Sequence, residues 1–534
     1  MTSKTNKLFL GFSALAASLF PSCSPTPIIF GTHLDPGFTS ISGDSAFQVA
    51  SYLASEKFSG REAGSPGLDS ALIFVQEKLQ KNGLVPFGSQ KSLFHPFDVK
   101  VNYSDADSAF FLAGSQQLTF GVDYTPFYLD HKVSYSYSGD LIFDGYGYKP
   151  EGILASELSE NPVKNKWVLL APGFPAGSKK TKFNDPGGLI TKLAAYQALG
   201  VAGILMLPDS SLSAEFEERS HFLTSDHFEL ISETISFPGL KSLPVFVLTD
   251  QAAGLLLKEF KIDAEKFSNL IGKGLPLPKS GTFIQAKSEL RLKSKNMEIS
   301  NLVGSIPGKR SDEIILIGAH LDHLGKKKDG SYYPGADDNA SGVSVVIELA
   351  RVLQLAEKAG LKPEKTLVFA IFNGEEKGLL GSAALSEDFS ASGIKVKTMI
   401  NLDMVGRESQ DSIEIVGHNR LSSQFKEFVE SFDKRSGLIF SQKLNIPGLT
   451  GDVFYRSDHY PFARKDIPVL FLTDGMGENW QRQSESDDYH LQSDTSDKLN
   501  KKKLERVTRL CYQLISGLSK TQLVFRYNQD QTDP

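Results

Sequence analysis

Residues 313–323 read Glu-Ile-Ile-Leu-Ile-Gly-Ala-His-Leu-Asp-His, an apolar run that ends in three polar or charged side chains. A continuous apolar run without alternation is typical of a strand that is buried on both faces, as in a parallel sheet. In open α/β sheets, ligands bind in the crevice beyond the carboxyl ends of the strands. The stretch therefore predicts a buried strand that delivers His320 to such an edge.

The same arrangement recurs further along the chain. Residues 365–372 form an apolar run that leads into Asn-Gly-Glu-Glu, and residues 397–402 lead into Asp403. A helical pattern covers residues 344–355, and another strand-like run covers residues 467–472. Strands that alternate with helices predict an α/β fold, with a mostly parallel sheet and helices on both of its faces.

Five side chains of the kind that bind metal ions follow one another in short motifs: His320, Asp337, Glu376, Asp403 and His490. Two histidines and three carboxylates suit zinc or a similar divalent ion. One catalytic zinc keeps three protein ligands and an open position, so five ligands suit two ions that share a carboxylate. Such a pair activates water for hydrolysis. Glu375, beside one of the five ligands, is free to act as the base.

These motifs, in this order, resemble the co-catalytic zinc aminopeptidase family, which includes bacterial leucyl-type aminopeptidases and glutamate carboxypeptidase. The resemblance covers residues 285–515 and, more weakly, residues 45–100. Within the second range, Phe-Ser-Gly-Arg-Glu-Ala-Gly-Ser-Pro-Gly (58–67) is similar to the family's opening segment. A zinc exopeptidase-like fold with two zinc ions per chain is the expectation that this resemblance implies.

The resemblance also implies a role for each of the five ligands. His320 and Asp403 would bind one zinc ion, Glu376 and His490 the other, and Asp337 would bridge the two. It further implies a cis peptide bond between Asp337 and the residue that follows it.

Two neighbouring side chains have expected supporting roles. Asp322, two residues after His320, is predicted to accept the second imidazole N–H and so fix the tautomer of the ligand. Tyr489 corresponds to a residue that stabilises the oxyanion in some relatives, and a phenol can donate to such a charge. A tyrosine that only packs is the alternative.

The identity of the last histidine ligand is open on composition alone. His323 and His459 are both candidates. His490 is preferred, because the family places its last ligand after the Ser-Asp-His motif (457–459).

The leading functional interpretation is a metal-dependent exopeptidase that acts on peptides or small proteins, and in the first place an aminopeptidase. The chain has no His-Glu-x-x-His motif, no P-loop and no Gly-x-Gly-x-x-Gly. Carboxypeptidase action on acidic dipeptides stays open, as does a glutaminyl-cyclase-like acyltransferase with one zinc ion. A binding protein that has kept the fold without the chemistry is disfavoured by the complete set of ligands.

A second domain is expected within the first. Strand-like runs at 166–172, 202–207 and 243–248 surround a helical pattern at 188–200 and resemble the protease-associated domain, a frequent insertion in this family. The expected organisation is an export signal (1–22), a tether (23–44), a first peptidase segment (45–129), the inserted domain (130–280), the main peptidase segment (281–520) and a tail (521–534).

The first residues predict export and a membrane anchor. Lys4 and Lys7 precede an apolar run at 8–20, too short to span a bilayer, and Cys23 follows in a setting that resembles a bacterial lipoprotein box. A secretory signal with an incidental cysteine is the alternative. Cys511 lies in an apolar helical pattern and is predicted to be a buried thiol. The net charge of −6 gives no sign of nucleic-acid binding.

Overall fold

The computed structural model describes residues 35–104, 109–128, 134–147, 163–173, 188–208, 226–231, 243–275, 277, 282–327, 329–433, 437–445, 453–474 and 488–520. The expected export signal, Cys23 and the expected C-terminal tail lie outside these residues. Within them, no helix has both the length and the apolar character needed to cross a bilayer.

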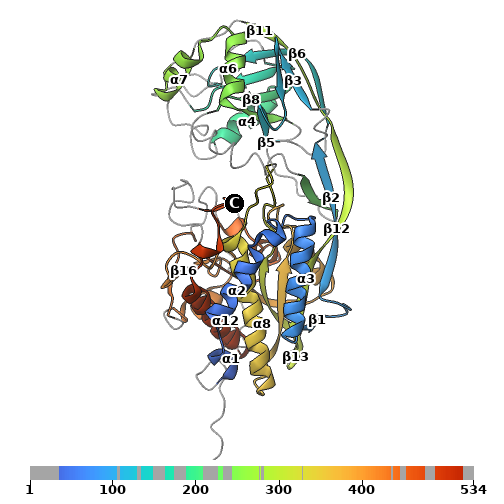
Figure 1. The fold of residues 1–534 in the computed structure, drawn as a ribbon, viewed down its shortest axis with the longest axis vertical. Helices are drawn as coiled ribbons and strands as arrows, with labels where there is room; N and C mark the ends of the chain where they lie inside the picture. Colours follow the sequence, from blue (N-terminus) through green and yellow to red (C-terminus); the bar gives the residue numbers. More distant parts are fainter. Residues whose placement is uncertain are drawn as a thin grey trace, which may run out of the picture.

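Two sheets organise the described residues, each in its own lobe, and Figure 1 shows them joined by the long strands β2 and β12. The first sheet has the order β17 (Ile439–Ser441), β16 (Ser412–Val416), β18 (Val469–Thr473), β15 (Lys395–Leu402), β13 (Arg310–His320), β14 (Lys365–Phe372), β12 (Leu292–Ile306), β2 (Phe94–Ser104) and β9 (His227–Leu230), with β1 (Val85–Pro86) paired to β12.

The centre of this sheet is the parallel part. Strands β18, β15, β13 and β14 run parallel to one another, whereas β12, β2, β9 and β1 pair in antiparallel fashion on one side. On the other side β16 is antiparallel to β18 and parallel to β17. The predicted α/β class is thus confirmed, while parallel pairing within the first sheet is confined to its central strands and the β16–β17 pair.

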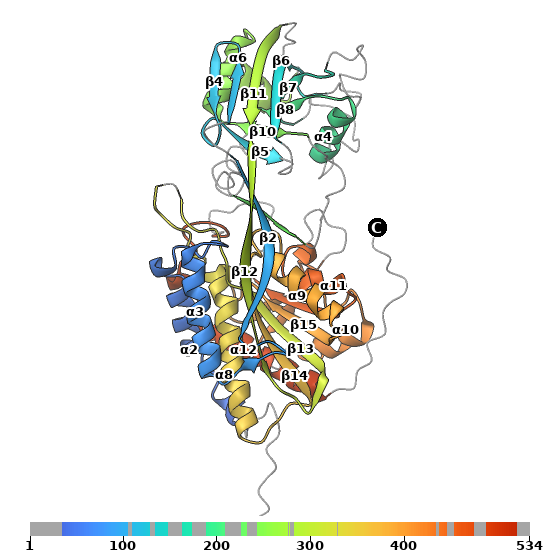
Figure 2. The ribbon, with the colours of Figure 1, turned by 90° about the vertical axis from the view of Figure 1, so that its right-hand side faces the viewer.

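Helices cover both faces of the first sheet, as Figure 2 shows. The helices α2 (Gly43–Leu53), α3 (Pro66–Lys81), α8 (Gly342–Lys358) and α12 (Lys501–Lys520) pack together on one face, with the short helix α1 (Pro36–Thr39) against α8. The helices α9 (Leu380–Ala391) and α11 (His459–Ala463) lie on the other, and α10 (Ser423–Glu430) follows β16. All residues of β14 are buried, which explains its uninterrupted apolar sequence.

Local signals set the ends of these helices. The side chain of Ser65 accepts a hydrogen bond from the backbone N–H of Leu68, and Pro66 takes the first position of α3. The helix ends before Gly83, whose φ of 90° lies in the left-handed region. Cys511, within α12, is fully buried as predicted.

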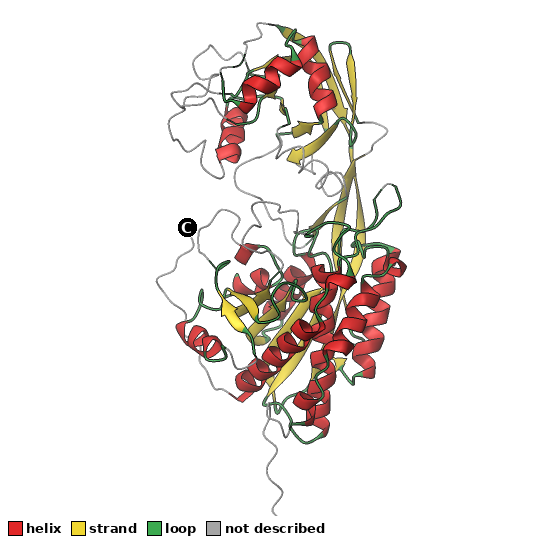
Figure 3. Cartoon of the chain, turned by 60° about the vertical axis from the view of Figure 1, so that its left-hand side comes forward, coloured by secondary structure: helices red, strands yellow, loops and turns green. Residues whose placement is uncertain are grey.

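The second lobe is larger than the predicted insertion. Its sheet has the order β4 (Gln116–Thr119), β3 (Phe110–Ala113), β11 (Phe283–Leu290), β6 (Tyr135–Phe143), β7 (Trp167–Leu170), β8 (Gly203–Met206), β10 (Val245–Leu248) and β5 (Tyr124–Tyr128). The helices α4 (Gly188–Ala198), α6 (Asp250–Glu259) and α7 (Ala264–Gly272) belong to the same lobe, seen from another side in Figure 3. Strands β3, β4, β5 and β11 fall outside the expected range 130–280 but belong to this sheet. Strand β11 pairs with β6 and β5 pairs with β10, whereas β3 pairs with β11 and β4 pairs with β3.

The two lobes are connected through one antiparallel ladder. Residues Leu292 to Leu302 of β12 pair with Ser104 to Phe94 of β2, so the chain leaves and re-enters the first lobe at adjacent positions. Strand β9 comes from the middle of the inserted sequence but pairs with β2. The second lobe is therefore inserted at one end of a hairpin-like pair.

Candidate metal centre

Three expected ligands meet at one edge of the central parallel strands. His320 is the last residue of β13, Asp403 follows β15 directly, and Glu375 and Glu376 lie in the turn after β14. Because β13 pairs in parallel with both β14 and β15, their carboxyl ends lie side by side. The strand order alone thus brings one histidine and the carboxylates together.

A first group of donor atoms consists of His320, Asp338 and Asp403, all buried. The Nε2 atom of His320 lies 3.1 Å from Oδ1 of Asp403 and 3.4 Å from Oδ1 of Asp338. Burial opposes a charge on His320, but the carboxylates of Asp403 and Glu375 raise its pKa well above the usual value. The same negative field favours a divalent cation at this place.

A second group shares Asp338 with the first. The Nε2 atom of His490 lies 3.3 Å from Oδ2 of Asp338 and 3.1 Å from Oε2 of Glu376. Burial works against a charged His490, yet Glu376 and Asp338 raise its pKa to about 10. One oxygen of Asp338 therefore faces His320 and the other faces His490, which is the arrangement of a carboxylate shared between two cation positions.

The predicted bridging residue was Asp337, and the structure corrects this by one position. The Oδ1 atom of Asp337 accepts a hydrogen bond of 2.7 Å from the backbone N–H of Gly406, and Asp337 belongs to neither set of clustered donor atoms. The cis peptide bond likewise joins Asp338 to Asn339 and not Asp337 to Asp338. Two identical side chains in tandem point in different directions, and the sequence does not show which one faces the site.

Asp322 supports the site in a way that differs from the prediction. Its carboxylate accepts hydrogen bonds of 3.1 Å from the backbone N–H groups of Glu375 and Glu376. The Nδ1 atom of His320 instead lies 3.2 Å from the backbone carbonyl oxygen of Asp322, and 4.0 Å from its nearest carboxylate oxygen. Asp322 thus fixes the turn that carries the two glutamates.

Glu375 lies at the edge of the first group. Its Oε2 atom is 3.9 Å from Nε2 of His320. Burial raises its pKa well above the usual value; His320 opposes this, and the carboxylate of Glu376 adds to it. A carboxylate with raised basicity next to a cation site suits a general base.

The segment that carries His490 is fixed at both ends. The backbone N–H groups of Asp337 and Asp338 donate to the carboxylate of Asp494 over 3.0 and 3.1 Å. Asp488 pairs with Arg407, with 2.6 Å between Nη2 and Oδ2. These contacts place the His490 segment against the loop that carries Asp338.

Tyr489 packs on the ligand that follows it. Its ring lies 3.7 Å from that of His490, centroid to centroid, with 21° between the planes. Its hydroxyl accepts a hydrogen bond of 3.2 Å from Nη2 of Arg456. Arg456 was not predicted, although it stands directly before the Ser-Asp-His motif.

The two alternative histidines, His459 and His323, lie in different places. His459 belongs to neither set of clustered donor atoms: it is buried, with its ring stacked on Phe471 at 4.5 Å, and burial lowers its pKa to about 3. His323 lies beside the second group, with Nδ1 at 2.9 Å from Oε1 of Glu376, and together with Asp338 and Glu376 it forms a buried set of donor atoms that could also hold a cation. His323, over which His490 was preferred as the last ligand, therefore also lies at the site.

The side chains of Ser457 and Arg61 support the site, and the sequence gives little indication of either role. Ser457 donates a hydrogen bond of 2.8 Å to Oδ2 of Asp403, and Asn401 donates to Ser457. Arg61, in the segment 58–67, is fully buried and donates to backbone carbonyls over 2.7–2.8 Å. Its acceptors are Leu53, Leu321, Pro334 and Gly335.

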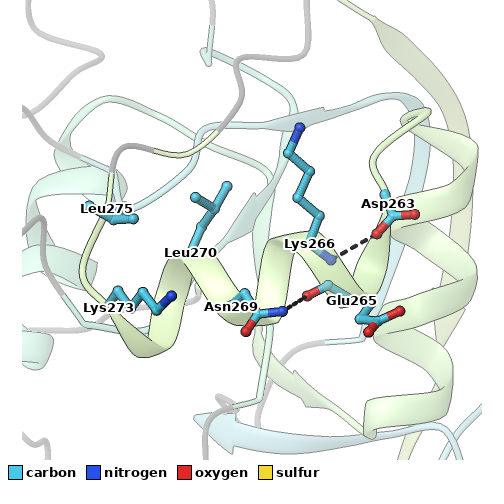
Figure 4. A pocket seen from close by; sticks show the side chains of 7 residues that line it. All are labelled: Asp263, Glu265, Lys266, Asn269, Leu270, Lys273 and Leu275. Atoms are coloured by element: carbon cyan, nitrogen blue, oxygen red, sulfur yellow. Dashed lines mark hydrogen bonds between the residues drawn. The ribbon is translucent and has the colours of Figure 1, made fainter.

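A hollow of about 340 Å³ lies elsewhere, over α7 in the second lobe (Figure 4). Its polar groups are partly used by the helix itself, since Asp263 caps α7 by accepting from the backbone N–H of Lys266. Asn269 donates to the backbone carbonyl of Glu265. The hollow is lined by no histidine, serine or cysteine, so the chemistry is assigned to the edge of the first sheet.

The donor set at that edge fits divalent cations. In the first group, and in the set formed by His323, Asp338 and Glu376 at the second position, the nitrogen and oxygen atoms lie within 4.8 Å of one another, and these residues are buried. Within the described residues, the buried Nε2 atom of His490 makes no hydrogen bond, as expected for a nitrogen that coordinates a cation. Imidazole and carboxylate donors in this arrangement suit zinc.

Comparisons with known proteins agree with this chemistry. Residues 301–515 match peptidase family M28. Leucine aminopeptidase 1 from Arthroderma gypseum is 42% identical over 189 residues, which is 34% of this chain and 48% of that protein. A probable zinc metalloprotease from Pyrenophora tritici-repentis is 37% identical over 127 residues, 23% of this chain and 28% of that protein. The chain spans about half the length of the leucine aminopeptidases that it matches.

Solved structures support the fold over nearly the whole chain. An aminopeptidase from Aneurinibacillus sp. strain AM-1 has a TM-score of 0.55 at 19% identity, covering 93% of this chain and 97% of that one. A zinc aminopeptidase from Bacillus subtilis has a TM-score of 0.54 at 18% identity, covering 90% of this chain and 96% of that one. The fold is therefore shared with these proteins.

Proposed function

We propose that this chain, whose residues 301–515 belong to peptidase family M28, is a zinc-dependent aminopeptidase. The observation that carries the proposal is the carboxylate of Asp338, whose two oxygens face two histidines in two donor groups beside Glu375. Such a site suits two zinc ions: His320, Asp338 and Asp403 would hold one, and Asp338, Glu376 and His490 the other. The names of the matched relatives, leucine aminopeptidase and zinc metalloprotease, support the substrate class and the metal.

Zinc ions bound there would lower the pKa of a water molecule and polarise the scissile carbonyl group of a peptide. Residues of the chain would carry out proton transfer and stabilise the oxyanion. Glu375 takes the proton from the attacking water and delivers it to the leaving amine. Tyr489, whose ring stacks on His490 and whose hydroxyl accepts from Arg456, is the donor that we propose for the developing oxyanion.

The metal part of the proposal is tested with two neighbouring aspartates. Asp338→Asn is expected to lose most bound zinc, because a neutral amide is a poor bridging ligand. Asp337→Asn is the matched control and is expected to keep it, because the Asp337 carboxylate faces Gly406. Elemental analysis of the purified proteins gives the zinc content. A wild-type protein without zinc, or equal loss in both variants, would contradict the assignment.

The substrate part is tested with a panel of amino-acid p-nitroanilides, N-blocked peptides and acidic dipeptides. Release of p-nitroaniline from unblocked amino acids, lost on N-terminal blocking and on chelation of zinc, is the expected result. Cleavage of acidic dipeptides at the C-terminal side alone would favour the carboxypeptidase, and cyclisation of N-terminal glutamine would favour the glutaminyl-cyclase-like alternative.

We also propose export and attachment to the bacterial membrane through a lipid on Cys23. The basic start, the apolar run at 8–20 and the position of Cys23 support this. Cys23→Ala is expected to release the protein from the membrane fraction and to abolish labelling by fatty acid. Membrane attachment of that variant, with no labelling of either form, would count against the lipid anchor.

A further inference from the structure

His323 closes the stretch that leads from β13 into the site, and its ring is fully buried beside the second donor group. Its backbone N–H donates to the carbonyl of Arg61 over 2.9 Å, which fixes the position of the residue. Its Nδ1 atom lies 2.9 Å from Oε1 of Glu376. Nothing in the proposed pair of three-ligand sites uses this contact.

We propose that His323 is a positioning residue for the second zinc ion. With a proton on Nδ1, it donates a hydrogen bond to Oε1 of Glu376, which leaves Oε2 of Glu376 available to the ion. The inference rests on the proposed function, since it assigns a role within the same metal centre.

The two oxygens of Glu376 support this division. Oε2 lies 3.1 Å from Nε2 of His490, whereas Oε1 lies 2.9 Å from Nδ1 of His323. The two histidines therefore approach the carboxylate at different oxygens. One oxygen is available to share an ion with His490, and the other is available to accept from His323.

The distances to Asp338 distinguish His490, a proposed zinc ligand, from His323, a proposed hydrogen-bond donor. Donor atoms about 2.0–2.1 Å from one tetrahedral zinc ion are about 3.3–3.4 Å from one another. The Nε2 atom of His490 meets this requirement, at 3.3 Å from Oδ2 of Asp338. The Nδ1 atom of His323 is 3.8 Å from the same oxygen. His490 is thus placed as a ligand, and His323 is too far from Asp338 to complete the same tetrahedron.

The second ring nitrogen of His323, Nε2, independently favours the role of hydrogen-bond donor. Its Nε2 atom is buried and has no hydrogen-bond partner in the described part of the chain. Coordination through Nδ1 would put the proton on Nε2, and a buried unpaired N–H costs about 1–3 kcal/mol. A proton on Nδ1 leaves only a lone pair at Nε2. The donor tautomer is therefore the one that this environment favours.

Two substitutions in the full-length protein test the role through zinc affinity. In His323→Asn the amide nitrogen can stand where Nδ1 stands, so the hydrogen bond to Glu376 is kept. In His323→Leu the donor is lost. Loss of such an outer partner typically weakens metal binding about 10–100-fold. Competition titration with a zinc chelator should show this loss for one of the two ions in His323→Leu, and affinity within about threefold of wild type in His323→Asn.

X-ray absorption on the zinc-loaded wild type provides a second readout that does not need a variant. Two coordinating histidines for two ions give an average of one imidazole per zinc. A higher average, or equally weak binding in both variants, would make His323 a direct ligand and overturn the proposal. Unchanged affinity in His323→Leu would deny it any role. A wild-type protein that binds no zinc would contradict the proposed function instead, so the two failures are distinguishable.

Discussion

Glu375 and Glu376 are adjacent in the sequence, yet their carboxylates have opposite electrostatic environments. Burial raises the pKa of Glu375 well above its usual value. Burial acts in the same direction on Glu376, but His490 and His323 outweigh it and hold the pKa of that carboxyl well below its usual value. One carboxylate is therefore suited to take a proton and the other to remain charged beside a cation.

This contrast leads to a prediction for two single substitutions. Glu375→Gln should keep both zinc ions and lose activity by at least about 10²–10⁴-fold, because an amide cannot accept the proton of the attacking water. Glu376→Gln should lower the zinc content at one position. Elemental analysis together with steady-state kinetics distinguishes them. Zinc loss in the first variant with retention in the second would reverse the two roles.

His459 has a residue-scale consequence for acid stability. Its folded-state pKa, about 3, lies below the unfolded value of about 6.5. The unfolded chain therefore binds a proton that the folded chain does not, and stability present above about pH 6.5 is lost as the pH falls toward 3. At about pH 5 the loss from this group is about 2 kcal/mol, at 1.36 kcal/mol per pH unit.

His459→Phe should remove that contribution. The larger ring can cost about 1–3 kcal/mol at every pH by overpacking, so the comparison is between pH values within each protein. Urea unfolding of the full chain at about pH 7.5 and pH 5 should show a drop smaller by about 2 kcal/mol in the variant. Equal drops in both proteins would mean that His459 takes up its proton in the folded state.

At the scale of elements, the site depends on one buried cation from the segment before α3. Arg61 links the end of α2, the residue after His320 and the loop that leads to Asp338, through its bonds to Leu53, Leu321 and Gly335. Burial lowers its pKa to about 10, and neighbouring carboxylates, first Asp338, oppose this. The guanidinium therefore stays charged and ties separate elements to the acidic centre.

Arg61→Lys is predicted to loosen this link. A lysine has no planar fork and cannot reach the same acceptors at once, and each buried carbonyl left unpaired costs about 1–3 kcal/mol. We expect a loss of about 3–5 kcal/mol in unfolding free energy and weaker binding of both zinc ions. Arg291→Lys, at a side chain that is 65% exposed, is the matched control. Unchanged zinc binding in Arg61→Lys would show that Arg61 does not support the metal site.

At the scale of the whole molecule, the second lobe is attached through the end of the β2–β12 ladder. Ser104 and Leu292 are paired there, so a two-residue Asn-Gly turn can join them after removal of residues 105–291. The excision also removes β9, with the buried residues Phe228 and Leu230. Losing two such side chains from the core costs about 3–6 kcal/mol.

The excised protein is nevertheless predicted to bind zinc with the stoichiometry of the full chain, because every donor residue lies between residues 320 and 490. Its preference between short and long peptides should change, since the second lobe is then absent. Zinc content and relative rates on a dipeptide and a long peptide are the measurements. Loss of zinc from an excised protein that is still folded would show that the second lobe helps to build the site.

The sequence by itself determined the strands and what stands at their ends. Uninterrupted apolar runs mark β13, β14 and β15 as buried, and a polar residue that ends such a run must lie at the edge of the sheet. The placement of His320, Glu376 and Asp403 at that edge was predictable for that reason. The repeated alternation of strand and helix likewise fixed the α/β class.

Only the tertiary structure decided which loop residues face the site. A loop has no period, so nothing in the sequence distinguishes Asp338 from Asp337. His323 is brought to Glu376, and Arg61 to the loop before Asp338, by contacts between segments that are 53 and more than 250 residues apart. The extent of the second lobe could not be predicted either, because β3 and β11 belong to it only through pairing with strands that are distant in the sequence.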